Sequence, residues 1–398
     1  MKPPNEKPLA VFSLALPDNP VEQANALFNA TVDEPDARSR EALADRIGEL
    51  LKHHNTPEIA LAQAEALLNV TAMEPNARKR EALADRIGEL LKHYNTPEIA
   101  LAQANALFNA AIDEPDARKC EALADRIGEL LKHYNTPEIA LTQAHALLNV
   151  TGREPNARKR EALADRIGEL LKHYNTPEIA LAQAKALRNA AAAVDEPDTP
   201  WREALADRIG ELLEHYNMPE IAFAQAEALL NATTGEPNAR KREALADRIG
   251  ELLNRHNTPE IALQQAMALY NAAVGEPDTG KSEVLADRIG ELLNRYNTSE
   301  IALEQAKVLY NATCSEQDTR RCEAVADRIG ELLKRHSTPE IALLQAKALR
   351  NAAVHAPFLS LRRMSLAWRA EGVRRAHEEM CRRAAGREKG GGDSGTEN

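Results

Sequence analysis

Three carboxylates, Glu81, Asp85 and Glu89, are the residues with the clearest chemical potential, and they are spaced four residues apart. On an α-helix this spacing places all three on one face, because residues i and i+4 are neighbours. Such an acidic ridge could perform general acid–base chemistry or bind a basic partner. The same trio recurs in eight segments of the chain, whereas an active site is normally one asymmetric constellation. We therefore predict that the protein is not an enzyme and that no residue is catalytic.

The acidic ridges remain candidate partner-binding surfaces. The residues that we single out on them are Glu81, Asp85, Glu89, Asp125, Glu129, Asp165 and Glu169. If the ridges line a groove, they form an anionic channel suited to a basic peptide. The alternative is a solvated charged face that Arg86 and Lys92 partly neutralise.

Histidine and cysteine give no sign of a metal or cofactor site. His93, His133 and His173 recur once per segment, and helix layers about 10 Å apart are too far from one another to share a metal ion. The four cysteines match neither a disulfide framework nor a zinc-ligand spacing. We predict no metal, no cofactor and free thiols, and hence a reducing, cytoplasmic compartment.

Two of the three ridge carboxylates, Asp85 and Glu89, belong to the octapeptide Ala84–Leu91, which occurs eight times at a spacing of 40 residues, with one step of 42. A fixed period of this length predicts a repeat array. Within one unit, the apolar period predicts helix A over 77–94 and helix B from Pro97 to about residue 110. Helix B has little polar surface, so it should be the more buried. Gly88 lies inside helix A at a cost of roughly 1 kcal/mol, which suggests close approach of another helix backbone.

The chain is therefore predicted to be all-α: a right-handed α-solenoid of about eight helix-turn-helix repeats with a C-terminal capping helix. We assign residues 1–16 to an N-terminal capping segment, with a secretion signal as the alternative, and 17–356 to the solenoid. Residues 357–387 form a basic helix, and 388–398 have the composition of a disordered tail. One side of the basic helix could be apolar, through Leu359, Met364, Leu366, Trp368, Val373 and Met380.

The unit resembles the tetratricopeptide class of helical repeats. The resemblance lies in the Ile87-Gly88 pair, in Leu91 three residues after the glycine and in Ala100 twelve after it, and it covers most of each unit from 36 to 354. The period of 40 differs from the 34 of that family, and Leu107 stands where the family has a second small residue. A related solenoid with a longer helix B is the alternative. The resemblance implies a superhelix in which helix A lines a concave groove that holds peptides or protein segments.

Helix B carries positions that differ between otherwise similar units. The variable residues that we single out are Asn105, His145, Lys185, Glu227, Met267 and Lys307. Packing does not dictate such positions, so they could read a partner, or they could simply drift on a solvent-facing surface. The invariant Gln103 and Asn109 could form a hydrogen-bond ladder between repeats, although recent copying explains them equally well.

Charge and composition narrow the function. The net charge of -11 disfavours a nucleic-acid binder, and no apolar run reaches the ~20 residues of a membrane span. The leading hypothesis is a non-catalytic scaffold that binds peptide or helical segments of a protein partner, which its acidic ridges suggest is basic. A nucleic-acid-binding repeat that uses the variable helix B positions is the alternative. The basic C-terminal helix could itself dock on the acidic ridge, within one molecule or between two.

Overall fold

The computed structural model describes residues 17–194, 198–358 and 360–390, with side chains as far as residue 383. These residues form helices and short loops, with no β-strand among them. The helices are α1 (Pro20–Asp33), α2 (Ala37–His54), α3 (Pro57–Met73), α4 (Ala77–Tyr94), α5 (Pro97–Ile112), α6 (Ala117–Tyr134), α7 (Pro137–Thr151), α8 (Ala157–Tyr174), α9 (Pro177–Ala191), α10 (Thr199–Tyr216), α11 (Pro219–Gly235), α12 (Ala239–His256), α13 (Pro259–Ala273), α14 (Thr279–Tyr296), α15 (Ser299–Ser315), α16 (Thr319–Arg335), α17 (Pro339–His355) and α18 (Leu361–Gly390).

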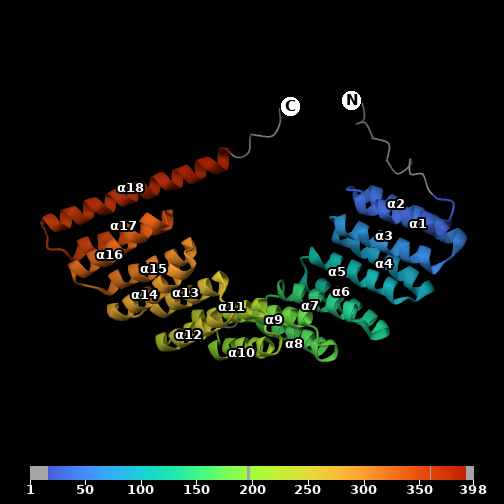
Figure 1. The fold of residues 1–398 in the computed structure, drawn as a ribbon, viewed down its shortest axis with the longest axis horizontal. Helices are drawn as coiled ribbons and strands as arrows, with labels where there is room; N and C mark the ends of the chain where they lie inside the picture. The colour runs from blue at the N-terminus through green and yellow to red at the C-terminus, as the bar shows by residue number, and fades with distance from the viewer. Residues whose placement is uncertain (1–16, 195–197, 359, 391–398) are drawn as a thin grey trace. The chain divides into compact units, whose positions relative to one another are not determined.

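The predicted all-α solenoid of helical repeats is confirmed. Even-numbered helices from α2 to α16 are the A helices, odd-numbered helices from α1 to α17 are the B helices, and each packs on its neighbours in sequence (Figure 1). α4 has the predicted bounds, while α5 extends two residues beyond the predicted end. The predicted capping segment 1–16 lies outside the described residues.

Short polar side chains fix the helix ends. The Thr96 hydroxyl accepts a hydrogen bond from the Ile99 amide at 3.3 Å, which is the predicted N-cap of helix B. At the other end of the two-residue A–B turn, Asn95 has φ 49°, a left-handed conformation that asparagine tolerates. Its side chain also accepts a hydrogen bond from the Tyr134 hydroxyl of the next repeat at 2.7 Å. The turn therefore also ties consecutive repeats together.

Met218 precedes α11 and makes no side-chain cap hydrogen bond, as its residue type predicts. Replacing Met218 with threonine should stabilise the protein by about 1 kcal/mol, because the hydroxyl would satisfy an orphan amide of the first turn. The reverse change, Thr258→Met at the start of α13, should cost a similar amount. Urea unfolding of both variants measures this, and a Met218→Thr variant no more stable than the parent would contradict the prediction.

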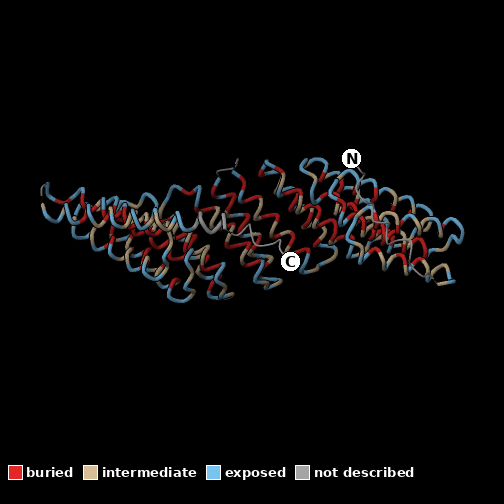
Figure 2. Tube along the Cα trace, turned by 90° about the horizontal axis from the view of Figure 1, so that it is seen from above, coloured by how far each residue is buried: buried red, intermediate tan, exposed pale blue. Residues whose placement is uncertain are grey.

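Burial follows the predicted amphipathic pattern. Leu83, Ala84, Ile87 and Leu91 of α4 are buried, and a larger share of α5 is buried than of α4. Figure 2 shows buried positions running along the helices, with exposed residues concentrated toward the outer surface. Buried arginine was not expected from the pattern. Arg80, at the start of α4, is only 8% exposed, and Arg40 and Arg202 at the equivalent positions are also buried.

The two kinds of helix are spaced differently. The chain forms two compact units, and within each of them consecutive B helices contact one another directly. In the described residues, consecutive A helices do not approach one another as closely. The buried surface of helix B is mostly alanine, including Ala100, Ala104 and Ala110, and small side chains allow helix axes to approach. The closer spacing makes the B side the concave side of each unit. The tetratricopeptide resemblance implies the opposite, with helix A on the concave side.

The repeats form two compact units, Met1–Glu196 and Pro197–Asn398. The boundary falls in the loop between Ala191 and Thr199, where the 42-residue step adds its extra residues. Within the second unit, α18 packs against α17 and begins at Leu361, four residues after its predicted start. The predicted single apolar side of this helix is wrong: Leu366 is buried, whereas Met364 and Trp368 are exposed. Leu359 lies outside the described residues.

Candidate binding surfaces

The acidic ridges are tied to the following repeat. Arg126 places Nη1 3.0 Å from Glu81 Oε1, and its Nη2 donates to Asp85 Oδ1. The same contact to one or both carboxylates of the preceding repeat is made by Arg86, Arg126, Arg166, Arg248, Arg288 and Arg328. The predicted neutralising role of Arg86 is therefore directed at the carboxylates of the preceding ridge, Glu41 and Asp45.

The third ridge carboxylate is neutralised within its own helix. Lys92 Nζ lies 2.7 Å from Glu89 Oε1, and the hydrogen bond from this ammonium lowers the pKa of Glu89. Lys132 and Lys172 hold Glu129 and Glu169 in the same way. These cationic neighbours favour a solvated, internally paired face over an open anionic channel in the first unit. In the second unit, Glu214, Asn254 and Asn294 stand in place of the lysine beside Glu211, Glu251 and Glu291.

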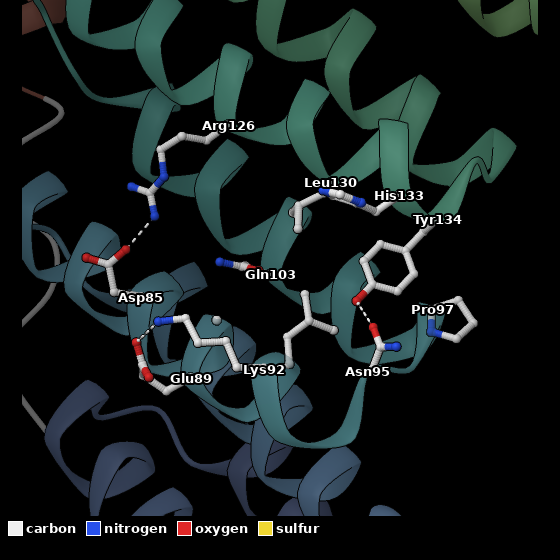
Figure 3. Close-up of a pocket in the computed structure, with 12 residues that line it drawn as sticks. Asp85, Glu89, Lys92, Asn95, Pro97, Gln103, Arg126, Leu130, His133 and Tyr134 are labelled. Carbon is white, nitrogen blue, oxygen red and sulfur yellow. Dashed lines mark hydrogen bonds and ion pairs between the residues drawn. The ribbon is translucent and has the colours of Figure 1, made fainter.

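Polar clefts lie between consecutive A helices of the first unit. The cleft between α4 and α6 has a volume of about 1020 Å³. Asp85 and Arg126 lie on one side of it, Glu89 and Lys92 on another, and Tyr134 points toward Asn95 (Figure 3). Equivalent clefts of about 990 Å³ and 720 Å³ lie between α2 and α4 and between α6 and α8. Charged groups in the cleft of Figure 3 pair with one another, and no group of three potential metal ligands occurs in the part of the chain that the structure describes.

The repeated glycine lines each cleft, where the invariant glutamine of helix B packs against it. A Cβ placed on Gly88 would lie 2.5 Å from Nε2 of Gln103, and every repeat places its glutamine against its glycine in this way. The expected approach of a helix backbone is therefore wrong, because the neighbour is the side chain of the invariant glutamine. In the best-defined case, Gln305 donates a hydrogen bond to the Ala286 carbonyl at 3.0 Å.

The other invariant amide does form a ladder between repeats. Asn109 Nδ2 donates to the Thr71 hydroxyl of the preceding repeat at 2.8 Å. Equivalent bonds to threonine come from Asn69, Asn189, Asn271 and Asn351. At these five junctions the partner is a buried threonine, whereas Asn149 donates to the Ala111 carbonyl. The ladder is therefore not a stack of amides.

The close contact between glycine and glutamine predicts that the effect of Gly290→Ala on stability reverses when Gln305 is removed. Gly290→Ala gains roughly 1 kcal/mol of helix propensity but displaces Gln305 from the Ala286 carbonyl, and an unsatisfied buried group costs about 1–3 kcal/mol. We expect Gly290→Ala to destabilise the parent and to stabilise a Gln305→Ala variant. Chemical denaturation of the four proteins of this double-mutant cycle measures the coupling. Stabilisation in both backgrounds would show that the glutamine contact has no energetic weight.

The helix B face carries the predicted variable residues, and it is half-exposed. Asn105, His145 and Lys185 lie on it in the first unit, and Glu227, Met267 and Lys307 lie on it in the second; all six are partly buried. Beside them, each unit has a row of partly exposed apolar side chains. The row consists of Leu61, Leu101, Leu141 and Leu181 in the first unit and of Phe223, Leu263, Leu303 and Leu343 in the second. A second row, seven residues on, contains the aromatic residues Phe108, Tyr270 and Tyr310.

Variable residues touch the preceding repeat. Lys307 Nζ lies 5.4 Å from the centre of the Tyr270 ring, and the rings of His145 and Phe108 are 6.2 Å apart. Burial lowers the pKa of His145, so this histidine is neutral at pH 7. Within each unit, the helix B face therefore carries apolar and aromatic groups edged by differing polar groups.

Cysteine reactivity should divide into two classes. Cys314 and Cys381 are exposed, whereas Cys120 and Cys322 are buried. Burial, with Glu316 and Asp318 nearby, raises the pKa of Cys322 to about 11, and the thiolate is the reactive form. At pH 8 we expect two thiols to react rapidly with Ellman's reagent and two only after denaturation. Four rapid thiols, or fewer than four after denaturation without reductant, would contradict this assignment.

A buried arginine at the start of helix A was missed by the sequence interpretation. Arg80 Nη1 donates to the Asn109 carbonyl at 2.8 Å and lies 2.7 Å from Asp113 Oδ2, while its Nε donates to the Glu74 carbonyl. We call this arrangement the arginine lock. Its signal was present as the recurrence of arginine at one position, in Arg40, Arg80, Arg160, Arg202 and Arg242.

No protein-family model matches this chain, and no curated protein sequence is similar to it. None of the helices in the described residues is long and apolar enough to cross a membrane.

Proposed function

We propose that this protein is a non-catalytic binding scaffold whose ligand is a peptide or helical segment of a partner protein, held along the helix B face. The observation that carries the proposal is the row of partly exposed apolar side chains, represented by Leu101 and Phe108, on the concave side of each unit. Binding energy at protein surfaces comes mainly from such apolar and aromatic anchors. The acidic ridges contribute less, because Arg126 and its equivalents already occupy them.

The repeat spacing sets the periodicity of a matching ligand. Neighbouring helix layers are about 8–10 Å apart, so apolar sites recur at that distance along the face. A chain in the polyproline II conformation rises about 3.1 Å per residue with three residues per turn, so it supplies a side chain to each site at every third residue. A helix with a pitch of 5.4 Å supplies one about every seventh residue. The variable residues Lys307 and Glu227 would then select the polar residues of the ligand in each repeat.

Selection from a library of random peptides displayed on phage tests this proposal. Enriched peptides should carry apolar residues at a period of three or seven. Phe108→Asp and Leu101→Asp, which remove partly exposed anchors, should each weaken binding of the selected peptides about tenfold or more.

Matched variants on the ridge, Glu81→Gln and Asp85→Asn, are the control and should bind within about twofold of the parent. Loss of binding in the ridge variants but not in the helix B variants would place the ligand on the other surface. Failure of the full chain to enrich any peptide would overturn the proposal.

The class of protein is also part of the proposal. Its partner-binding role is the one that the tetratricopeptide resemblance implies, although the closer packing of the B helices moves the concave side to helix B. We place the protein in the cytoplasm, on the argument that four cysteines without a disulfide framework suit a reducing compartment.

A nucleic-acid ligand is the second candidate, and one observation favours it. On the helix B face, Lys307 lies over the Tyr270 ring and Lys347 lies over the Tyr310 ring. Proteins that bind single-stranded nucleic acids use aromatic rings to stack on the bases and cations to contact the phosphates. The net charge of -11 opposes it. Titration with single-stranded RNA and DNA at 50 and 200 mM salt decides: binding that falls steeply with salt supports a nucleic-acid ligand, and no binding at low salt excludes it.

A further inference from the structure

α18 occupies the place of one more A helix at the end of the second unit. Arg369 Nη1 lies 2.9 Å from Glu323 Oε1, and its Nη2 donates to Asp327 Oδ1. These are the contacts that Arg328 makes one repeat earlier with Glu283 and Asp287. The predicted docking of the basic helix on acidic residues is thus found within one molecule, at the last ridge only.

The ridge of α18 itself is apolar. Counted back from Arg369, Trp368 stands at the position of Asp327 and Met364 at the position of Glu323. In every other A helix these positions carry the carboxylates that face the following repeat. Trp368 is 79% exposed, Met364 66% and Leu361 85%. The surface that elsewhere meets the next layer through ion pairs can here meet another surface only through apolar contact.

Gly372 gives a second, independent sign of a partner. It lies one helical turn after Trp368 on the same face, and a Cβ there would meet nothing within 4 Å. The glycines of the A helices are explained by a glutamine above them, but no side chain in the described residues explains Gly372. A glycine beside exposed Trp368 and Leu361 leaves room for a large side chain of another helix to pack there.

We propose that a second copy of this chain covers this face, with two α18 helices packed antiparallel about a two-fold axis. The pattern is self-complementary. With the axis between residues 366 and 367, Leu361 of one helix faces Gly372 of the other, and Trp368 faces Ser365. Each large side chain therefore meets a small one, which is the requirement of an isologous interface.

The residues that flank this face need not move for the contact to form. Phe358 lies in the turn before α18, and a guanidinium packs favourably on an aromatic face. Phe358 is 78% exposed and already has the Arg363 guanidinium 5.4 Å from its ring. The opposite side of α18, with Leu366 and Ala370 buried, stays against α17, so dimer formation requires no rearrangement of the unit.

Sedimentation of the full chain over a range of concentrations tests the proposal. We expect a monomer–dimer equilibrium in the parent. Trp368→Glu and Gly372→Arg should each raise the dimer dissociation constant about tenfold or more, because each places a charge or a bulky group in the contact. Val284→Glu is the matched control, since Val284 is an exposed apolar residue of α14 in the same unit, and it should leave the dissociation constant within about twofold.

Fluorescence gives a readout that a merely destabilised protein would not reproduce. The chain has two tryptophans, and Trp201 is buried, so a Trp201→Phe variant reports on Trp368 alone. Its emission should shift to shorter wavelength as the concentration rises through the dissociation constant. A chain that sediments as a monomer at every concentration, or that forms open-ended assemblies while Trp368 keeps the emission of a water-exposed indole, would overturn the proposal.

Discussion

Replacement of Arg80 by methionine should destabilise the first unit by about 3 kcal/mol. The guanidinium is buried and donates to the Glu74 and Asn109 carbonyls while pairing with Asp113. Hydrogen bonds to charged groups contribute about 1.5–3 kcal/mol each, and buried carbonyls that lose a donor add a desolvation penalty. Methionine keeps the apolar stem but supplies no donor, so the loss reports on the lock and not on side-chain volume.

Hydrogen exchange locates this effect. Because a repeat array is stabilised by nearest-neighbour contacts, the loss should appear first in the loop before α4 and at the C-terminal end of α5. A change of about 3 kcal/mol corresponds to roughly a hundredfold faster exchange of amides that open with the loop.

Arg78→Met is the control for Arg80→Met. Arg78 is exposed in the same turn and its replacement should change stability by no more than about 0.5 kcal/mol. Equal effects of the two substitutions would show that the lock contributes nothing beyond surface charge.

The helices and their ends could be predicted because they depend on local signals. The apolar period of 77–94 and the cap Thr96 each act within a few residues, and both appear where expected. The lock could not be predicted in the same way, because its donor and acceptor are 29 residues apart in sequence. Burial of an arginine contradicts the usual preference of that residue type, and only the fold reveals the carbonyls that compensate for it.

The binding surfaces show a similar division. Which residues share the helix B face follows from the helical period, and Asn105 and His145 lie on it as predicted. Which partner neutralises Glu81 depends on the offset between layers, and this offset makes it Arg126 of the next repeat. Which helix lies on the concave side depends on the relative spacing of the A and B helices, and this spacing cannot be inferred from the sequence of one repeat.

Three repeats lack the arginine of the lock and carry Cys120, Ser282 or Cys322 at that position. In the repeat of Cys120, a second arginine takes over the role of the missing one. At that position Cys120 donates only to the Ala111 and Glu114 carbonyls. Arg153 approaches from the opposite side and donates to the Asn149 carbonyl at 3.2 Å and to the Ile112 carbonyl. These correspond to the Asn69 and Val32 carbonyls that Arg40 binds in the first repeat.

This exchange predicts that Arg153→Ala costs about 2–3 kcal/mol, because two carbonyls lose a charged donor. Alanine at Met73, the equivalent position at the end of α3 in a repeat with an intact lock, should cost less than about 0.5 kcal/mol. Cys120→Arg alone should destabilise the protein, since two guanidinium groups would compete for one set of carbonyls. In the Cys120→Arg/Arg153→Ala double variant the ordinary lock returns, and stability should recover to within about 1 kcal/mol of the parent.

Denaturant unfolding of the two single variants and the double variant measures the coupling between residues 120 and 153. Contacting residues typically couple by 0.5–3 kcal/mol, and distant ones add independently. Stability can recover in the double variant only if the side chains at residues 120 and 153 serve the same carbonyl acceptors. Helix propensity acts locally, so it cannot couple a residue of α6 to a residue of the loop after α7. If the stability losses of Cys120→Arg and Arg153→Ala simply add in the double variant, Arg153 does not replace the arginine of the lock in this repeat.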